Sequence, residues 1–370
     1  MASVVRAGRA KTHGGSESVR GSMSADCLRS ARCTTLPDME PQRSPSERTT
    51  RFVLAALLSL ALLGTLGAQT APWCAITVST SDGLRDALET MPPGSVICLR
   101  PSVYEAGLAV RQSVVLRGVG RPEQVVLEGA GEPDEPVIDF YANPSAPYVA
   151  ILENVTVRGA VGGSGDVEGR SDHGLFIDRD VHVLLRDVIC SDNEGAGVLV
   201  VEGGSLMARG CAFSDNLHGV AVVDRSSARF DDCEFIDNGV GLALAQDGQV
   251  MLDACLISGN ADVGALLLSG QATLEDCEIS DNGWGCLLGS PSNPPLLLRM
   301  AYCDVIRNRE VGIAWLTAEC YDPSVPDGAE VLISGKRNEI PRPDEPDGNA
   351  GGGLCPEYPG APWPKDFVKD

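Results

Sequence analysis

Cysteines recur at a constant interval and have the right chemistry for a metal site or for disulfides. Cys211, Cys233, Cys255 and Cys277 are each separated by 22 residues, and Cys303 follows after 26. A tetrahedral zinc site needs four sulfurs about 2.3 Å from one centre, and a disulfide needs Cβ atoms about 3.8 Å apart. Equal positions on stacked parallel strands lie about 4.8 Å apart in a straight row, which fits neither arrangement. We therefore interpret this column as buried free thiols that act as small apolar residues.

Some of the cysteines outside this column lie in irregular segments of the chain. Cys74, Cys98, Cys320 and Cys355 occur in segments that do not follow the repeat. Cysteines of an exported protein commonly pair. We expect the disulfides Cys74 to Cys98 and Cys320 to Cys355.

Two columns of carboxylates offer acid–base or calcium chemistry. The first column directly precedes the repeated asparagines and contains Asp192, Asp215, Asp237 and Asp281. The second lies two residues before the repeated cysteines and contains Asp231, Asp253 and Glu275. Stacked carboxylates repel one another, and a bound Ca²⁺ ion would relieve the repulsion. The alternative, which we favour, is a solvated acidic face without any cofactor.

A histidine in an interrupted part of the repeat is the other candidate for catalysis. His173 follows Asp172 in the glycine-rich stretch from Gly159 to Gly174, which we expect to be a loop inserted into one coil. His173 and His182 would form a general acid–base pair if the fold brought them together. The catalytic candidates of an enzymatic interpretation are Asp172, His173, Asp192, Asp215 and Asp237.

The repeat itself determines where these residues lie. Apolar residues alternate with polar ones over segments of three to five residues, which is the period of strands with one buried face. Wound as parallel strands, several copies in series bury an apolar face that one copy cannot bury alone. An asparagine follows each position of the cysteine column by five residues. Asparagine tolerates left-handed backbone angles, and its side-chain amide can hydrogen-bond to the equivalent asparagines of the coils above and below. The asparagines are expected to form a ladder at a turn: Asn193, Asn216, Asn238, Asn260, Asn282 and Asn308.

This pattern resembles the right-handed parallel β-helix proteins of the pectate-lyase-like superfamily. The resemblance is closest to their short-repeat branch, which contains NosD, a periplasmic copper-maturation protein, and carbohydrate-associated surface proteins. The family pattern is met at Leu274, Cys277, Ile279, Asn282 and Gly285 to Leu288. It implies an all-β right-handed parallel β-helix of about ten coils. Lyases of the family use Ca²⁺ with an arginine base and its glycosidases use clustered aspartates, but neither set is evident in this sequence.

The sequence divides into four segments. Residues 1–50 are polar and read as a disordered or mis-assigned extension, and residues 51–71 read as a signal peptide. The β-helix is expected over 76–340, beginning with a short amphipathic capping helix that ends at Pro92, and residues 341–370 form a Pro- and Gly-rich tail. No membrane contact is expected beyond the signal segment.

Charge restricts the partners. The chain carries 51 acidic and 29 basic residues, a formal net charge of −22, which disfavours nucleic acids and anionic membrane surfaces. We expect a secreted, periplasmic or cell-surface protein that binds carbohydrate or a protein partner, with polyanionic sugars requiring a bridging cation. The alternatives are a polysaccharide lyase or hydrolase, which requires a cleft with carboxylates beside Arg or His, and a NosD-like metallocofactor assembly factor. A binding module would show exposed aromatic residues in a line, and the repeats offer few of them beyond Trp284 and Trp315.

Overall fold

The computed structural model describes the chain from Trp73 onward, with several gaps. The described residues are 73–131, 135–141, 147–162, 172–289, 295–316, 320, 331–341, 345, 347–355, 363–364 and 366–368. The expected extension (1–50) and signal peptide (51–71) lie outside them, as does most of the loop expected between Gly159 and Gly174. No helix among the described residues is both long enough and apolar enough to span a bilayer.

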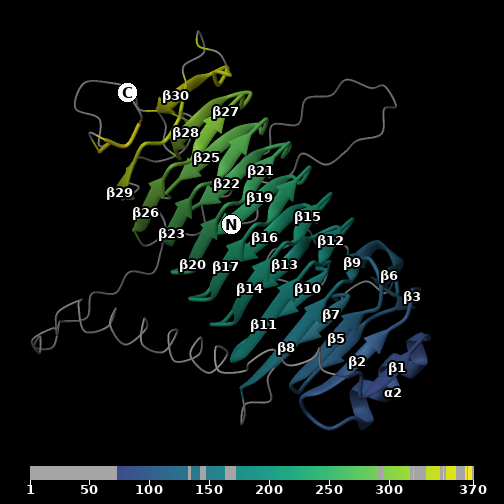
Figure 1. Ribbon diagram of the computed structural model, residues 1–370. Helices are drawn as coiled ribbons and strands as arrows, with labels where there is room; N and C mark the ends of the chain where they lie inside the picture. Colours follow the sequence, from purple (N-terminus) through teal and green to yellow (C-terminus); the bar gives the residue numbers. More distant parts are fainter. Residues whose placement is uncertain are drawn as a thin grey trace, which may run out of the picture. The chain divides into compact units, whose positions relative to one another are not determined.

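Three parallel sheets contain all the strands (Figure 1). Sheet A, in spatial order, comprises β1 (Ile76–Val78), β2 (Ser95–Leu99), β5 (Val114–Gly118), β8 (Tyr148–Glu153), β11 (Val181–Arg186), β14 (Ser205–Arg209), β17 (Ser227–Asp231), β20 (Gln249–Asp253), β23 (Gly270–Glu275), β26 (Leu296–Ala301) and β29 (Val331–Lys336). Sheet B comprises β3 (Ser102–Glu105), β6 (Val125–Glu128), β9 (Thr156–Arg158), β12 (Ile189–Ser191), β15 (Ala212–Ser214), β18 (Glu234–Ile236), β21 (Leu256–Ser258), β24 (Glu278–Ser280) and β27 (Asp304–Ile306). Sheet C comprises β4 (Leu108–Val110), β7 (Ile138–Phe140), β10 (Leu175–Ile177), β13 (Ala196–Val200), β16 (His218–Val222), β19 (Val240–Leu244), β22 (Val263–Leu267), β25 (Trp284–Leu288), β28 (Val311–Trp315) and β30 (Gly352–Cys355).

Consecutive strands belong to different sheets, so the chain winds as a solenoid. The triplets from β2–β3–β4 to β26–β27–β28 make nine complete turns, close to the ten that the repeat predicted. Each strand pairs in parallel with the equivalent strand one turn away, for example β17 with β20. The all-β solenoid predicted from the sequence is confirmed. Its interior is filled by inward-facing side chains such as Phe213, Phe230 and Phe235, all fully buried.

Aspartates at the corners explain much of the chain's acidity. One turn of the solenoid passes through left-handed backbone at three corners, as at Asp232, Asp237 and Asp247, with φ of 56°, 55° and 61°. Apart from glycine, asparagine and aspartate tolerate this conformation best, because their short polar side chains hydrogen-bond locally. A solenoid with three such corners in each turn therefore accumulates carboxylates on its surface.

Both ends of the solenoid are covered. At the start, helix α2 (Ser81–Thr90) is capped by the Thr80 hydroxyl, which accepts from the Gly83 N–H at 3.2 Å, and it buries Leu84 in the core. This helix is the predicted capping helix. A short 3-10 helix, η1 (Pro122–Gln124), lies later in the chain, directly before β6. At the other end, β30 and the fully buried Phe367 lie beyond residue 340, where the sequence predicted only a tail.

The asparagine column forms a continuous hydrogen-bonded ladder. Asn238 Nδ2 donates to Asn260 Oδ1 at 3.1 Å, Asn260 Nδ2 donates to Asn282 Oδ1 at 2.8 Å, and the pattern continues in both directions. The last rung is Asn349, whose Oδ1 accepts from Asn308 Nδ2 at 2.8 Å. The predicted turn ladder is present, and it extends one rung into the segment expected to be a tail.

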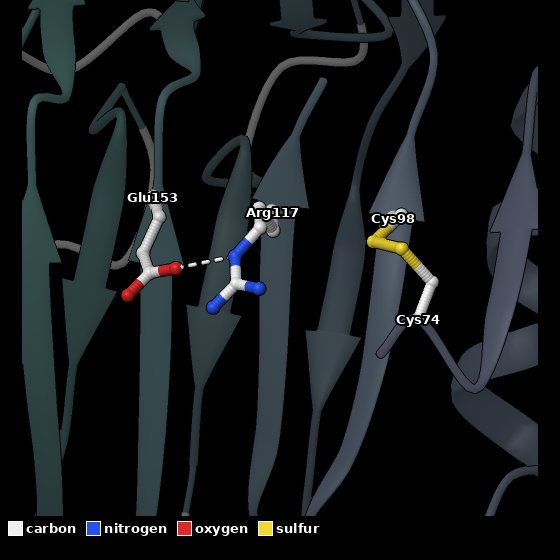
Figure 2. Close-up of a disulfide and its surroundings, with 4 residues drawn as sticks. All are labelled: Cys74, Cys98, Arg117 and Glu153. Carbon is white, nitrogen blue, oxygen red and sulfur yellow. Dashed lines mark hydrogen bonds and ion pairs between the residues drawn. A yellow bond between two sulfur atoms is a disulfide. The ribbon is translucent and has the colours of Figure 1, made fainter. Parts of the chain in front are cut away.

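The cysteines separate into buried thiols and two disulfides. Among the described residues, seven cysteines are free and buried, including the column from Cys211 to Cys303. Thiols of the column donate to the carbonyl two residues earlier, as from Cys277 to Glu275 at 3.2 Å. Cys74 pairs with Cys98, shown in Figure 2, and Cys320 pairs with Cys355, each with Cα atoms 5.6 Å apart. These are the two pairs that the sequence suggested.

Candidate functional site

The aspartates that precede the ladder occupy a structural corner. Asp192, Asp215 and Asp237 are exposed, with left-handed backbone at φ of 55° to 56°. The register of β12, β15 and β18 places them on successive coils. Among the described residues, no hydrogen bond or ion pair joins two of these carboxylates. The left-handed corner geometry by itself favours aspartate at these positions.

The second acidic column lies on the outer face of sheet A. Asp231, Asp253 and Glu275 are in register on adjacent strands. Arg229 Nη2 lies 2.7 Å from Asp231 Oδ1 and 3.9 Å from Asp253 Oδ2, so a guanidinium compensates the carboxylates where a calcium ion had been considered. The described part of the chain contains no group of three or more His, Cys, Asp or Glu side chains arranged to hold a metal ion.

Asp172 and His173 are buried at the start of β10. Each is 2% exposed, and the Asp172 Oδ1 atom has no hydrogen-bond partner. The His173 Nδ1 atom accepts from the Ala196 N–H at 2.9 Å, which keeps that nitrogen deprotonated. The second histidine of the expected acid–base pair, His182, is exposed on sheet A, so the fold places the two on different sheets.

The structure instead places His173 near His218. Both lie on the outer face of sheet C, in one row with Ala196 between them. Gly195 is required for this packing, because a Cβ at that position would come within 2.8 Å of His173 Nδ1. Burial, with a smaller contribution from His173, lowers the pKa of His218 to about 4. The two imidazoles therefore form a buried neutral cluster, which the wide separation in sequence concealed.

Acid is expected to destabilise the protein through His218. Its pKa falls from 6.5 in the unfolded chain to about 4 in the folded one, so the unfolded state binds more protons between these values. The stabilisation from the neutral side chain is complete above pH 6.5 and is lost as the pH falls towards 4, by up to about 3 kcal/mol. Urea unfolding measured at pH 7.5 and pH 4 should show a smaller acid-induced loss in His218→Val than in the wild type. The exposed His182→Ala is the control, and an unchanged loss in His218→Val would refute the assignment.

The outer face of sheet A carries three rows of side chains in register across its strands. The first row comprises Val149, His182, Ser205, Ser227, Gln249, Gln271, Leu297 and Leu332. The middle row comprises Val115, Ile151, Leu184, Met207, Arg229, Met251, Thr273, Arg299 and Ser334. The edge row comprises Arg117, Glu153, Arg186, Arg209, Asp231, Asp253, Glu275, Ala301 and Lys336.

Arginines make this face basic in a chain that is strongly acidic. The three rows contain six basic residues and four acidic ones, a difference of +2, whereas the whole chain carries −22. Glu153 is mostly buried and holds two of the arginines: Arg117 Nε is 2.6 Å from Glu153 Oε2, and Arg186 Nη1 is 2.9 Å from Glu153 Oε1. Figure 2 shows Arg117 and Glu153 meeting across adjacent strands. Arg209 has no ion pair among the described residues.

Exposed apolar side chains interrupt the charges on the same face. Met207 and Met251 in the middle row are 43% and 41% exposed, and Leu297 and Leu332 in the first row are 42% and 56% exposed. Long flexible side chains of this kind adapt to irregular partners. Trp284 and Trp315 are half-buried against hydrophobic clusters, so neither belongs to a line of exposed aromatic residues.

A cavity of about 470 Å³ borders this face, within the size range of small-ligand sites. It is lined by Arg179, Glu202, Asp224 and Arg225, which lie in the turns that lead from sheet C into sheet A. Arg179 donates to Glu202, and this pairing raises the pKa of Arg179. Sequence inspection missed the cavity because the residues at its shared repeat position, Arg179, Glu202 and Asp224, differ in type from coil to coil.

Comparison with known proteins supports the fold. Residues 170–322 match the family model described as "Right handed beta helix region". No curated protein matches the sequence. Similar solved structures include ORF18 of Geobacillus virus E2 (12% identity, TM-score 0.46, covering 81% of this chain and 65% of that one) and the A-module of the Azotobacter vinelandii mannuronan C-5 epimerase AlgE4 (16%, 0.41, 70% and 92%). An alginate lyase from Paenibacillus is similar as well (13%, 0.46, 75% and 97%). With TM-scores below 0.5, these similarities carry no argument about function.

Proposed function

Since this chain is a right-handed parallel β-helix protein whose repeated columns serve the fold, we propose that it is a binding protein for an extended carbohydrate that carries acidic groups. The ligand lies on the outer face of sheet A. The concentration of arginines there, in a chain of net charge −22, is the observation that carries the proposal.

Arginine suits this ligand chemistry. Its planar guanidinium donates paired hydrogen bonds to a carboxylate or sulfate and stays charged at any physiological pH. Arg209 and Arg299 are exposed and have no ion pair among the described residues, so they are available to a ligand. A bridging cation, which the overall charge had suggested for polyanionic sugars, is therefore unnecessary on this face.

Neutral donors beside the arginines suit sugar hydroxyl groups. Ser205, Ser227, Gln249 and Gln271 are consecutive in the first row. Strands of one sheet lie about 4.8 Å apart, so these side chains offer hydrogen-bonding groups at regular intervals along the solenoid. A repeating polymer matches such a surface better than a compact ligand does. Export, which the two disulfides favour, would bring the protein to such polymers.

The binding proposal predicts a local effect of arginine removal. Arg209→Ala should weaken binding to an acidic polysaccharide such as alginate or polygalacturonate about fivefold, because one exposed charge contact contributes up to about 1 kcal/mol. The measurement is isothermal titration calorimetry at two salt concentrations, with affinity falling as salt rises. Arg158→Ala, on sheet B, is the matched control. Absence of binding to any polysaccharide of a broad panel, or equal losses in both variants, would contradict the proposal.

The cavity beside sheet A supports a second candidate function, a polysaccharide hydrolase or lyase. Glu202 and Asp224 line it from successive coils together with Arg179 and Arg225, which is the combination of carboxylates and arginine that an enzyme would need. New reducing ends or unsaturated uronate products from the same panel would establish this activity. Their loss in Glu202→Gln and Asp224→Asn would assign it to the cavity.

A further inference from the structure

Between β11 and β23, the charges of the edge row form two blocks along the solenoid. Arg186 and Arg209, on β11 and β14, are followed by Asp231, Asp253 and Glu275 on the next three strands of sheet A. The boundary between the blocks falls between β14 and β17. A surface with one basic and one acidic block complements itself when it is turned end for end.

We propose that the outer face of sheet A packs against the same face of a second copy of this chain, with the two solenoids antiparallel. The symmetry axis runs parallel to the strands, between β14 and β17. This operation keeps the position along each strand and reverses the order of the coils. Each row therefore faces itself, and each contact occurs twice, as in any isologous interface.

The edge row then meets its own complement. Arg209 on β14 faces Asp231 on β17, and Arg186 on β11 faces Asp253 on β20. Glu153 on β8 faces Glu275 on β23, but the Glu153 carboxylate is already bonded by Arg117 and Arg186. Charge complementarity of this kind fixes the register of an interface.

The other two rows are compatible with the same register. In the middle row, the exposed Met207 faces the aliphatic part of Arg229, and Leu184 faces Met251. In the first row, Ser205 faces Ser227. The arrangement covers the exposed methionines that otherwise contact water.

The face is large enough for a stable dimer. In this register ten of the eleven strands overlap, from β2 to β29. At about 4.8 Å apart, each about five residues long at about 3.3 Å per residue, they span roughly 790 Å². A standard interface buries about 800 Å² on each partner. At 0.15 M salt the Debye length is about 8 Å, so the acidic corners beyond the interface repel only weakly.

The inference rests on the proposed function in one respect, because both use the outer face of sheet A. The dimer would cover the ligand site, so the ligand and the second copy would compete for this face. An anionic polymer that occupies Arg186 and Arg209 would displace the acidic block of the partner. The protein would then be a dimer in the absence of the polymer and a monomer when bound to it.

Sedimentation velocity of the protein at about 0.15 M salt and at concentrations up to about 100 µM tests the dimer, because interfaces of this size associate at micromolar concentrations or below. The wild type should be dimeric. Arg186→Glu and Asp253→Arg should each shift it to monomer, and the double swap should restore the dimer. Glu234→Arg, the same charge change on sheet B, should leave it dimeric. A monomeric wild type, a dimer lost equally in Glu234→Arg, or a double swap that stays monomeric would overturn the inference.

Asp253→Arg separates this inference from the proposed function. It removes the dimer contact while adding positive charge to the face, so its affinity for the acidic polysaccharide should equal or exceed that of the wild type. Polysaccharide binding without a dimer would refute the inference and leave the function standing. A dimer with no polysaccharide binding by the wild type or by Asp253→Arg would refute the function and leave the inference standing.

Discussion

Asn260→Ala is expected to destabilise the folded protein by about 4 kcal/mol. The Asn260 side chain is fully buried, and its Oδ1 accepts from both the backbone N–H and the Nδ2 of Asn238, at 3.0 and 3.1 Å. Its Nδ2 donates to the Phe235 carbonyl and to Asn282 Oδ1. Alanine leaves the Asn238 backbone N–H without an acceptor, which costs about 1 to 3 kcal/mol. It also removes three side-chain hydrogen bonds, to Asn238 Nδ2, the Phe235 carbonyl and Asn282 Oδ1, each worth about 0.5 to 1.5 kcal/mol.

The urea midpoint measures this loss, since the slope with denaturant should not change. Asp262→Ala, an exposed carboxylate in the same turn, should change stability by less than about 0.5 kcal/mol. Asn260→Asp retains the acceptor and should fall between the two. If Asn260→Ala were as stable as Asp262→Ala, the ladder would be a consequence of the fold with no part in stabilising it.

The fold was predictable because one interval repeats with little variation. Asn238 and Asn260 are separated by the same 22 residues as the neighbouring rungs, so stacking them required no knowledge of distant contacts. Asn349 was missed because the last turn contains a long insertion, and 41 residues separate it from Asn308. Where the 22-residue interval is not kept, the repeat cannot show which residues of neighbouring coils are paired.

The candidate binding face was harder to predict because it depends on the register between columns. Arg186 and Arg209 share one position in their copies, but the next three copies carry acidic residues there, and Arg229 lies two residues earlier in its copy. The arginines therefore form no regular column in the sequence. They share one face only after the strands of sheet A are aligned with alternate side chains outward. The corner aspartates, by contrast, form a regular column and attracted attention as catalytic candidates, although the left-handed backbone explains them.

The buried histidines illustrate the same limit. His173 and His218 are 45 residues apart, and their proximity arises because equivalent positions of β10, β13 and β16 adjoin and the residue between them is the small Ala196. The sequence suggested His182 instead, since it is nearer to His173 along the chain. A strand between them and a change of sheet place His182 on a different face.

Phe235→Ala is expected to cost about 4 kcal/mol through the cavity it would leave in the core. The Phe235 ring is stacked on Phe213 with centroids 5.1 Å apart and meets Phe230 edge-on at the same distance. Rigid neighbouring coils leave little freedom for collapse around the missing ring, and Phe→Ala substitutions in cores typically cost 3 to 5 kcal/mol.

Phe235→Leu and Met251→Ala are the matched comparisons for this substitution. Leucine keeps most of the buried volume and should cost about 1.5 kcal/mol. The outward-facing Met251, 41% exposed, should cost less than about 0.5 kcal/mol on truncation. Contacts between neighbouring coils stabilise a solenoid, so the stability lost in Phe235→Ala should be seen in the unfolding of the whole domain. Unchanged unfolding in Phe235→Ala would show that the coils around β18 do not limit the stability of the solenoid.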